Sequence, residues 1–139
     1  MANWNERNPG VIEEFRKNRD SGGGNPPARP LLLLTTTGAR SGLQRINPLM
    51  YLKDGDRWVI FASKGGAPAH PDWYHNLVAN PTVTLEVGVE TFEADATVAA
   101  GEERDTLYAR QAQQFPMFGD YEKKAAGRQI PVVVLTRRR

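Results

Sequence analysis

Two segments of the sequence combine a hydroxyl, a cation and two glycines, a composition suited to binding a phosphate or a carboxylate. Residues 35–42 read TTTGARSG and residues 62–68 read ASKGGAP. Glycines permit a concave backbone whose N–H groups face an anion, and Arg40 and Lys64 bring positive charge. The first segment is not a Walker A loop, which requires a glycine, four residues, and then glycine, lysine and a hydroxyl. Taken alone, it is better explained by an ordinary turn.

A third segment, residues 70–77 (HPDWYHNL), combines the start of a helix with two aromatic rings. Proline near the start of a helix leaves free backbone N–H donors, which favour an anion, and Trp73 and Tyr74 offer flat faces for a ring system. Each residue also has a plainer explanation. The aromatic rings could belong to the core, His75 could serve packing or hydrogen bonding, and His70 could cap the helix.

Arg45 adds a third cation to this group. If the flanking strands pair as hairpins, Arg45 lies near Arg40 or Lys64, and three aligned cations on a nearly neutral protein need an anionic partner. The alternative is that they form ordinary surface ion pairs with nearby carboxylates, those of Asp54, Asp56 or Asp72. The sequence leaves both explanations open.

The rest of the composition excludes several classes of chemistry. The chain of 139 residues has no cysteine and two histidines, so we expect no metal site, no disulfide and no thiol nucleophile. It has no Gly-x-Ser-x-Gly or His-Glu-x-x-His motif and no evident carboxylate pair on a shared face, which leaves hydrolytic or covalent chemistry without an agent. A protein that holds a borrowed redox cofactor needs only anchors and a shaped pocket, and fits better.

Charge and hydropathy bear on partners and location. The formal net charge is +2, but three of the cations are the C-terminal residues 137–139, so the folded body is close to neutral and no nucleic-acid partner is expected. The longest aliphatic runs, residues 31–34 and 132–135, are far shorter than the ~20 residues of a membrane span. The first residues lack the apolar stretch of a signal peptide. We therefore expect a cytoplasmic protein, with at most a peripheral contact to the inner face of the membrane, and the sequence fixes no oligomeric state.

Short strands and a few helices must position these segments. Hydrophobic alternation and turn residues predict six strands, at residues 31–37, 43–52, 57–63, 82–87, 90–98 and 130–136. Helices are predicted over residues 71–79 and 102–114. Two hairpin systems without a strand–helix–strand repeat favour an α+β fold, mainly β with peripheral helices, in which a six-stranded antiparallel barrel closes its own edges.

The chain is expected to divide into three parts. Residues 1–30 hold an amphipathic helix, with Val11, Ile12 and Phe15 on one face, followed by a connection rich in glycine and proline. Residues 31–136 form the barrel domain, which binds the cofactor, and residues 137–139 are a basic tail. Four cations and four anions balance within the first twenty residues, which favours docking of the helix on the domain over binding to anionic lipid.

Four separated blocks of the sequence agree in order and spacing with one known family. They are residues 32–42, followed by Arg45 and residues 47–49; residues 62–66; residues 70–77; and residues 80–81. With these blocks the chain resembles the deazaflavin-dependent nitroreductase family over about residues 8–135. Members of that family are split β-barrel oxidoreductases, with an FMN-binding-like fold, that use coenzyme F420.

The resemblance implies a cofactor site whose hairpin tip holds the polyanionic phosphate and oligoglutamate tail. The residues implied to bind the cofactor are Ala39, Arg40, Ser41, Arg45, Ile46, Asn47, Pro48, Leu49, Met50, Phe61, Ala62, Ser63, Lys64, Asp72, Trp73, Tyr74, His75, Asn76 and Phe118. Reduced deazaflavin would deliver a hydride from its C5 to an acceptor lying over the ring. Ser63 and Tyr121 are the implied catalytic residues, which would position the acceptor or relay a proton.

The acceptor side departs from the family pattern. Phe115, Phe118 and Tyr121, the implied substrate pocket, stand where members that reduce bulky quinones and nitro compounds carry several tyrosines. Two of these three rings lack a hydroxyl, and a phenyl ring stacks on a planar acceptor without donating a hydrogen bond to a developing oxyanion, a contact worth ~1 kcal/mol or more. A planar hydrophobic quinone is therefore the favoured acceptor, ahead of an enone or a nitro compound. Simple lid or core packing is the alternative role for the three rings.

Two other functions fit the same sequence. A split barrel that uses FMN is a second kind of reductase, although a long cationic groove argues against it. A non-catalytic protein that stores or carries coenzyme F420 would bind the cofactor without turnover. Comparing the binding of the two cofactors, and turnover with several acceptors, separates the three readings.

Overall fold

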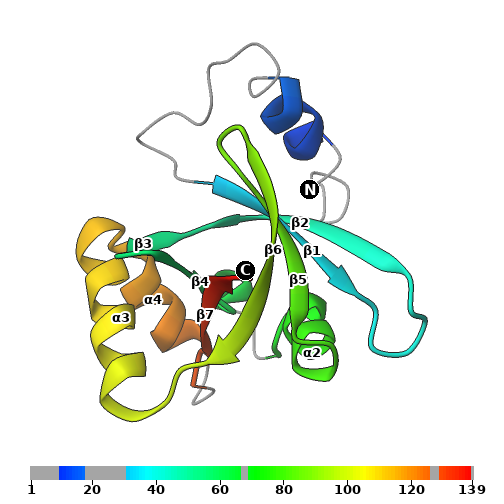
Figure 1. Cartoon of the computed structure of the whole chain (residues 1–139). Helices are drawn as coiled ribbons and strands as arrows, with labels where there is room; N and C mark the ends of the chain where they lie inside the picture. Colours follow the sequence, from blue (N-terminus) through cyan, green and yellow to red (C-terminus); the bar gives the residue numbers. More distant parts are fainter. Residues whose placement is uncertain (1–9, 18–30, 67–68, 126–128, 139) are drawn as a thin grey trace.

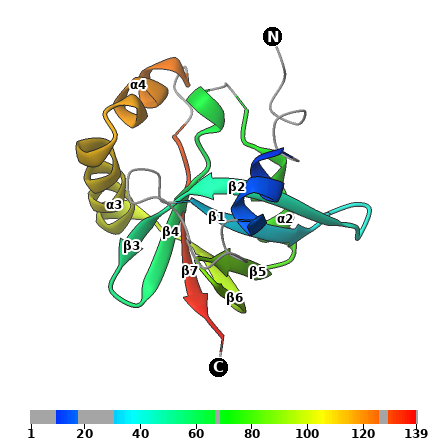
Figure 2. The same ribbon diagram turned by 90° about the horizontal axis from the view of Figure 1, so that it is seen from above.

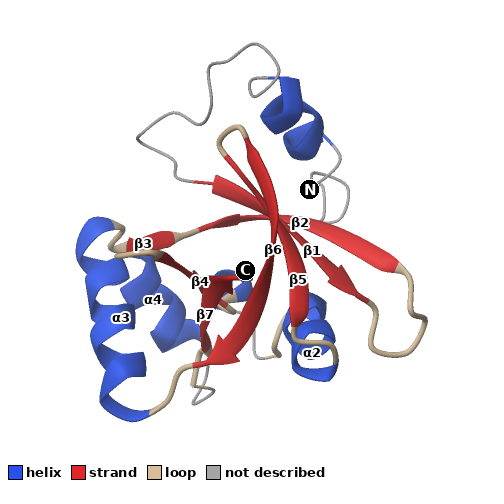
Figure 3. Ribbon diagram, in the orientation of Figure 1, coloured by secondary structure: helices blue, strands red, loops and turns tan. Residues whose placement is uncertain are grey.

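The computed structural model describes residues 10–17, 31–66, 69–125 and 129–138 (Figure 1). The strands are β1 (Leu31–Thr37), β2 (Gln44–Met50), β3 (Leu52–Asp54), β4 (Arg57–Phe61), β5 (Thr82–Val87), β6 (Glu90–Val98) and β7 (Val132–Arg137). The helices are α2 (Asp72–Ala79), α3 (Gly101–Gln114) and α4 (Met117–Lys124), with a 3₁₀ turn η1 (Lys64–Gly66) and a further helix over residues 10–17. The strands form the centre of the molecule and the helices lie around them (Figure 3).

All seven strands form one antiparallel sheet in the order β2-β1-β5-β6-β7-β4-β3. The first and last strands of this order, β2 and β3, are consecutive in the chain and are separated by Tyr51 alone. The sheet therefore curls until its two edges meet in one segment, which is the split barrel expected from the sequence.

The predicted number of strands was wrong, because the segment at residues 43–52 forms two strands. Its first part, β2, pairs with β1, and its second part, β3, pairs with β4. The chain changes partner at Tyr51, which belongs to neither ladder. The prediction of a single strand followed hydrophobicity alone, which carries no information about a change of neighbour.

Alternate residues of the central strands build two apolar cores on opposite faces of the sheet. One core contains Ile60 and Val133 and is completed by Trp73 and Leu77 of α2. The other contains Phe61 together with buried residues of α3 and α4. The middle of β7, Val132 to Leu135, is buried throughout, as expected for a strand that is apolar on both sides. Figure 2 shows α3 and α4 together on one flank of the sheet.

The helix over residues 10–17 packs on the sheet through one buried ring and one ion pair. Phe15 is buried, and Arg16 donates two hydrogen bonds to the buried carboxylate of Glu86 on β5, at 3.0 and 2.8 Å. Among the described residues no helix is long and apolar enough to cross a membrane.

Candidate functional site

The hairpin tip between β1 and β2 is fastened to helix α2 by a buried asparagine. Asn76 accepts a hydrogen bond from the backbone N–H of Ala39 at 3.0 Å and donates one to the Thr36 hydroxyl at 3.2 Å. Asn80, just past the end of α2, donates a third bond to the carbonyl of Thr37 at 3.3 Å. Two residues that the resemblance assigned to the cofactor, Ala39 and Asn76, are thus in direct contact.

The glycines of the tip serve the turn itself. The N–H of Gly38 bonds the Leu43 carbonyl at 2.7 Å and the N–H of Gly42 bonds the Gly38 carbonyl at 3.0 Å. A side chain on Gly38 would lie 2.6 Å from the Ser41 hydroxyl oxygen, and Gly42 has a φ of +70° that favours glycine. Most backbone donors of the tip are therefore engaged inside the protein, so anion binding here depends on side chains.

Arg40 and Arg45 are the arginines available for that purpose. Eight arginines fall within the described residues, and six of them have an acidic partner there: Arg16, Arg57, Arg104, Arg110, Arg137 and Arg138. Neither Arg40 nor Arg45 forms an ion pair or a side-chain hydrogen bond with any described residue, and both are exposed. These two guanidinium groups are therefore free to bind an external anion.

The carboxylates that could have paired with these cations do not do so within the described residues. Asp54 accepts hydrogen bonds from Arg57 and from Arg110, and these two contacts, that of Arg57 foremost, hold the pKa of Asp54 below its usual value. No ion pair of Asp56 or Asp72 with a cation is present within the described part of the chain. The alternative of ordinary surface ion pairs is thus not realised for Arg40, Arg45 or Lys64 there.

The register of β1 and β2 places Arg45 beside the fastened tip. Arg45 lies directly opposite Thr36, and opposed residues of an antiparallel pair share a face of the sheet. Asn47 and Leu49 follow on that same face, opposite Leu34 and Leu32. The remaining implied residues of β2, Ile46, Pro48 and Met50, belong to the opposite face, where Met50 packs against the core of α3 and α4. The cofactor residues implied on this strand are therefore divided between two faces.

The aromatic residues on α4 form one cluster with β4. The ring of Phe118 lies 5.6 Å from that of Phe61 and 5.2 Å from that of Tyr121. Tyr108 of α3 donates its hydroxyl to the Phe118 carbonyl at 2.5 Å. Phe118 is 5% exposed, so it forms part of the core, whereas Phe115 and Tyr121 are only partly buried.

The two implied catalytic residues, Ser63 and Tyr121, lie on neighbouring elements: Ser63 precedes the turn η1, and Tyr121 lies on α4, which contacts η1. A side chain on Gly66 would lie 3.1 Å from the Tyr121 backbone. Helix α4 therefore packs closely on η1. Lys64, the first residue of η1, is exposed and forms no ion pair with a described residue. Lys64 thus belongs to a turn that packs on α4, whereas Arg40 belongs to the tip that is fastened to α2.

The implied residues of α2 differ in their surroundings. Trp73 is buried in the core and contributes no free face. Tyr74, in contrast, is half-buried and forms a group of rings with His70 and His75, at centroid distances of 4.9 and 5.8 Å. Asp72 and His75 are exposed.

Two residues of this region were not anticipated from the sequence. Thr36 accepts a hydrogen bond from the Asn76 side chain. This role is visible only once the packing of α2 against β1 is known. Tyr51 lies half-buried where β2 gives way to β3 and packs on the core that includes Trp73. Its burial raises the pKa of the Tyr51 phenol.

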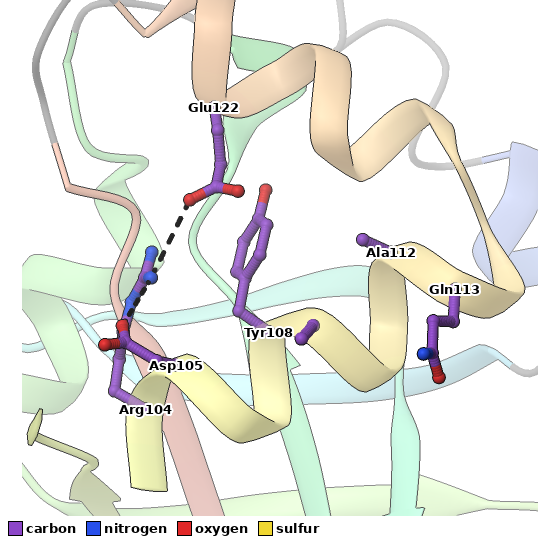
Figure 4. Close-up of a pocket in the computed structure, with 7 residues that line it drawn as sticks. Arg104, Asp105, Tyr108, Ala112, Gln113 and Glu122 are labelled. Atoms are coloured by element: carbon purple, nitrogen blue, oxygen red, sulfur yellow. Dashed lines mark hydrogen bonds and ion pairs between the residues drawn. The ribbon is translucent and has the colours of Figure 1, made fainter. Parts of the chain in front are cut away.

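Two surface pockets lie outside the implied cofactor residues. One, of about 490 Å³, lies between α3 and α4 and is lined by Tyr108, Ala112 and a buried Arg104 paired with Asp105 and Glu122 (Figure 4). The other, of about 530 Å³, is a polar hollow over β1 and β5. Both are distinct from the corner formed by Arg40, Arg45 and Asn76.

A curled antiparallel sheet flanked by helices defines a split β-barrel protein; its hairpin tip and the start of β2 carry two exposed arginines that lack partners among the described residues. The sequence model of the family described as F420H(2)-dependent quinone reductase matches residues 11–137. The chain belongs to this family. The quinone reductase description is the one that the family model carries, and the nitroreductase label stays a prediction.

Individual relatives agree with this assignment. An F420H(2)-dependent quinone reductase of Mycobacterium tuberculosis is 45% identical over 118 residues, covering 81% of this chain and 77% of the relative. A solved structure of an F420-H2 dependent reductase shares 40% identity, with a TM-score of 0.70, over 77% of this chain and 94% of its own. Another, described as a domain-swapped dimer, shares 36% identity, with a TM-score of 0.73, over 91% of this chain and 97% of its own.

Proposed function

We propose that this protein is an oxidoreductase that uses coenzyme F420 to reduce a quinone. The observation that carries the proposal is the family match, which spans residues 11–137 and therefore includes every strand of the barrel. The reduced cofactor supplies the hydride, and the protein supplies binding, orientation and exclusion of water. An enone or a nitro compound is the next acceptor to test.

The free cations of this chain fit the chemistry of coenzyme F420. Its phosphate and glutamate tail is polyanionic, and guanidinium groups bind phosphate and carboxylate through two parallel hydrogen bonds. Arg40 and Arg45 lack partners among the described residues and stand at one corner of the barrel, beside the exposed Ser41. We assign the tail to this corner, with Lys64 as a further cation nearer to α4.

The flat part of the cofactor needs a surface that is partly apolar and partly exposed. Asn47 and Leu49 lie on the same face as Arg45, and the half-buried Tyr74 lies on α2. We place the ring across the end of β2, between this face and Met50 of the opposite face, because Met50 packs against the core that contains Phe115 and Tyr121. Ser63 and Tyr121, which stand on elements in close contact, would position the acceptor or deliver a proton to it. Phe115 and Tyr121 supply partly exposed aromatic surface, and the buried Phe118 supports them from beneath.

The remaining expectations about partners also belong to this proposal. The apolar face of the helix over residues 10–17 is turned to the sheet, since Phe15 is buried and Arg16 is bonded to Glu86. This arrangement supports docking of the helix on the domain over insertion into lipid. No nucleic-acid partner is proposed, because the formal net charge is only +2 and three of the cations are the C-terminal residues 137–139. The cytoplasmic location stays a prediction.

The test is to mix the purified protein with reduced F420 and a menadione-type quinone and to follow the return of the absorbance of the oxidised cofactor. We expect recovery that depends on the protein, and weaker cofactor binding in Arg40→Ala and Lys64→Ala. Binding of FMN in place of F420 would support the second kind of reductase. Binding of F420 without turnover of quinones, enones or nitroaromatic compounds would support a carrier.

A further inference from the structure

Helix α3 carries a glutamine whose side chain is enclosed in the protein without a hydrogen-bond partner. Gln111 is 0% exposed, and neither its Nε2 nor its Oε1 atom has a partner among the described residues. A buried amide that makes no hydrogen bond is costly, and native structures contain few of them. Such a group calls for a physical explanation.

The other buried polar side chains of the described residues are all bonded. Thr36 and Asn76 bond each other, Glu86 accepts two bonds from Arg16, and Arg104 donates two bonds to the Ile130 carbonyl. Four of the five buried polar side chains in the described part of the chain are therefore satisfied. Gln111 is the exception, and an apolar residue of similar size at this position would avoid its cost.

The position of Gln111 on α3 directs it to the aromatic cluster. It lies three residues after Tyr108, on the same face of α3, and the N–H of Phe115, the residue that caps the end of α3, bonds the Gln111 carbonyl at 2.8 Å. Tyr108 and Phe115 both belong to the core that also contains Phe61, Phe118 and Tyr121. The unpaired amide is therefore enclosed beside the rings assigned to the acceptor side.

We infer that Gln111 is a further hydrogen-bond donor of the acceptor pocket, beside Ser63 and Tyr121: its Nε2 amide bonds a carbonyl oxygen of the quinone. This inference rests on the proposed function and names a specificity-determining residue for it. Phe115 and Phe118 have no hydroxyl to donate, and Gln111 supplies the missing donor from the same cluster. Phe115 and Tyr121, at the edge of the cluster, are only partly buried, so their side chains can move to admit a planar ring.

The chemistry requires a donor that keeps its proton. The quinone gains two electrons with the hydride from the reduced cofactor, takes one proton from solvent, directly or through the hydroxyl of Ser63 or Tyr121, and becomes a hydroquinone. Negative charge develops on the quinone oxygen as the hydride arrives, and a fixed amide N–H stabilises that charge. The amide neither gains nor loses a proton, so it acts at every pH at which the protein is folded.

The test compares Gln111→Met with Gln113→Met, in which an exposed glutamine of the same helix is replaced. We expect Gln111→Met to raise the melting temperature by about 3–6 °C, because an unsatisfied amide is removed from the core. We expect the same variant to lower kcat/KM for menadione by about tenfold or more, while the Kd for F420 stays within about twofold. Gln113→Met should leave both rates and affinities unchanged.

A second measurement uses the wild-type protein and does not depend on the folding of a variant. The side-chain amide resonances of Gln111 should shift on adding menadione to the protein with oxidised F420, and those of Gln113 should not. The inference is overturned if Gln111→Met leaves kcat/KM unchanged, or if its loss of F420 affinity is as large as its loss of kcat/KM. It is also overturned if the Gln111 amide resonances do not shift when the quinone is added. Failure of the wild-type protein to bind F420 at all would instead contradict the proposed function.

Discussion

Replacing Asn76 with alanine tests whether the hairpin tip is held in place for the cofactor. The change removes two hydrogen bonds, from Ala39 N–H at 3.0 Å and to the Thr36 hydroxyl at 3.2 Å. Each such bond contributes about 0.5–1.5 kcal/mol, so we expect a loss of about 1–3 kcal/mol in the free energy of unfolding. For a domain of this size that corresponds to a melting temperature lower by roughly 4–10 °C.

The same change should also weaken cofactor binding, since Arg40 follows Ala39 directly. Without these bonds the tip is free to move, and cofactor binding must order it. Ordering costs about 0.5–1.5 kcal/mol of binding free energy for each immobilised side chain. We therefore expect the Kd for F420 to rise by about two- to tenfold. Fluorescence titration measures the Kd, and Val78→Ala, at an exposed position of α2, is the control.

A double-mutant cycle separates positioning from direct contact. If Asn76 acts by placing Arg40, the double variant should lose less binding free energy for F420 than the sum of the losses in Asn76→Ala and Arg40→Ala. A variant of Asn76 that loses stability but binds F420 as tightly as the wild type would refute the reasoning, because the tip would then have no part in the site.

Three further changes test other parts of the structure. Arg45→Ala should weaken F420 binding and reduce the dependence of log Kd on log salt concentration, because one cation fewer meets the tail; an unaltered salt dependence in titrations would count against its role. Gly66→Ala should cost about 2 kcal/mol or more in denaturant unfolding, because Gly66 has a φ of +84° and its new Cβ would lie 2.7 Å from the Lys124 Cβ. Gly119→Ala, with nothing within 4 Å of the new Cβ, should instead stabilise helix α4 by about 0.5–1 kcal/mol. Burial raises the pKa of Tyr51, so the folded state favours the neutral phenol and stability should fall as the pH rises above ~10; Tyr51→Phe should show a smaller fall in the same unfolding experiment, and an identical fall would contradict it.

Much of the fold follows from local patterns in the sequence. Alternating and continuous apolar runs correctly predict an antiparallel barrel with helices outside it and a central last strand, and the family resemblance adds that the barrel is split. The break at Tyr51 could not be predicted, because it arises from β2 pairing with β1 and β3 pairing with β4. The hydrophobic pattern of the segment is the same whether it forms one strand or two.

The site shows the same division between local and tertiary information. Glycines and cations in the sequence mark the hairpin tip, but only the structure shows that the N–H groups of Gly38 and Gly42 are engaged within the turn. The regular spacing of the aromatic residues on α4 does not distinguish the buried Phe118 from the partly exposed Tyr121. The burial of Gln111 without a partner is likewise invisible in the sequence, where a glutamine in a helix is normally a surface residue.

The central claim is that Arg40 of the hairpin tip and Arg45 of the adjoining strand β2 hold the anionic tail of the cofactor. The most direct measurement compares the Kd of complete F420 with that of its deazaflavin chromophore lacking the phosphate and glutamates, in the wild-type protein and in a variant with both Arg40 and Arg45 changed to alanine. We predict that the wild-type protein prefers the complete cofactor strongly and that the double variant loses most of this preference. An equal preference in the two proteins would contradict the claim, because the tail would then be bound elsewhere.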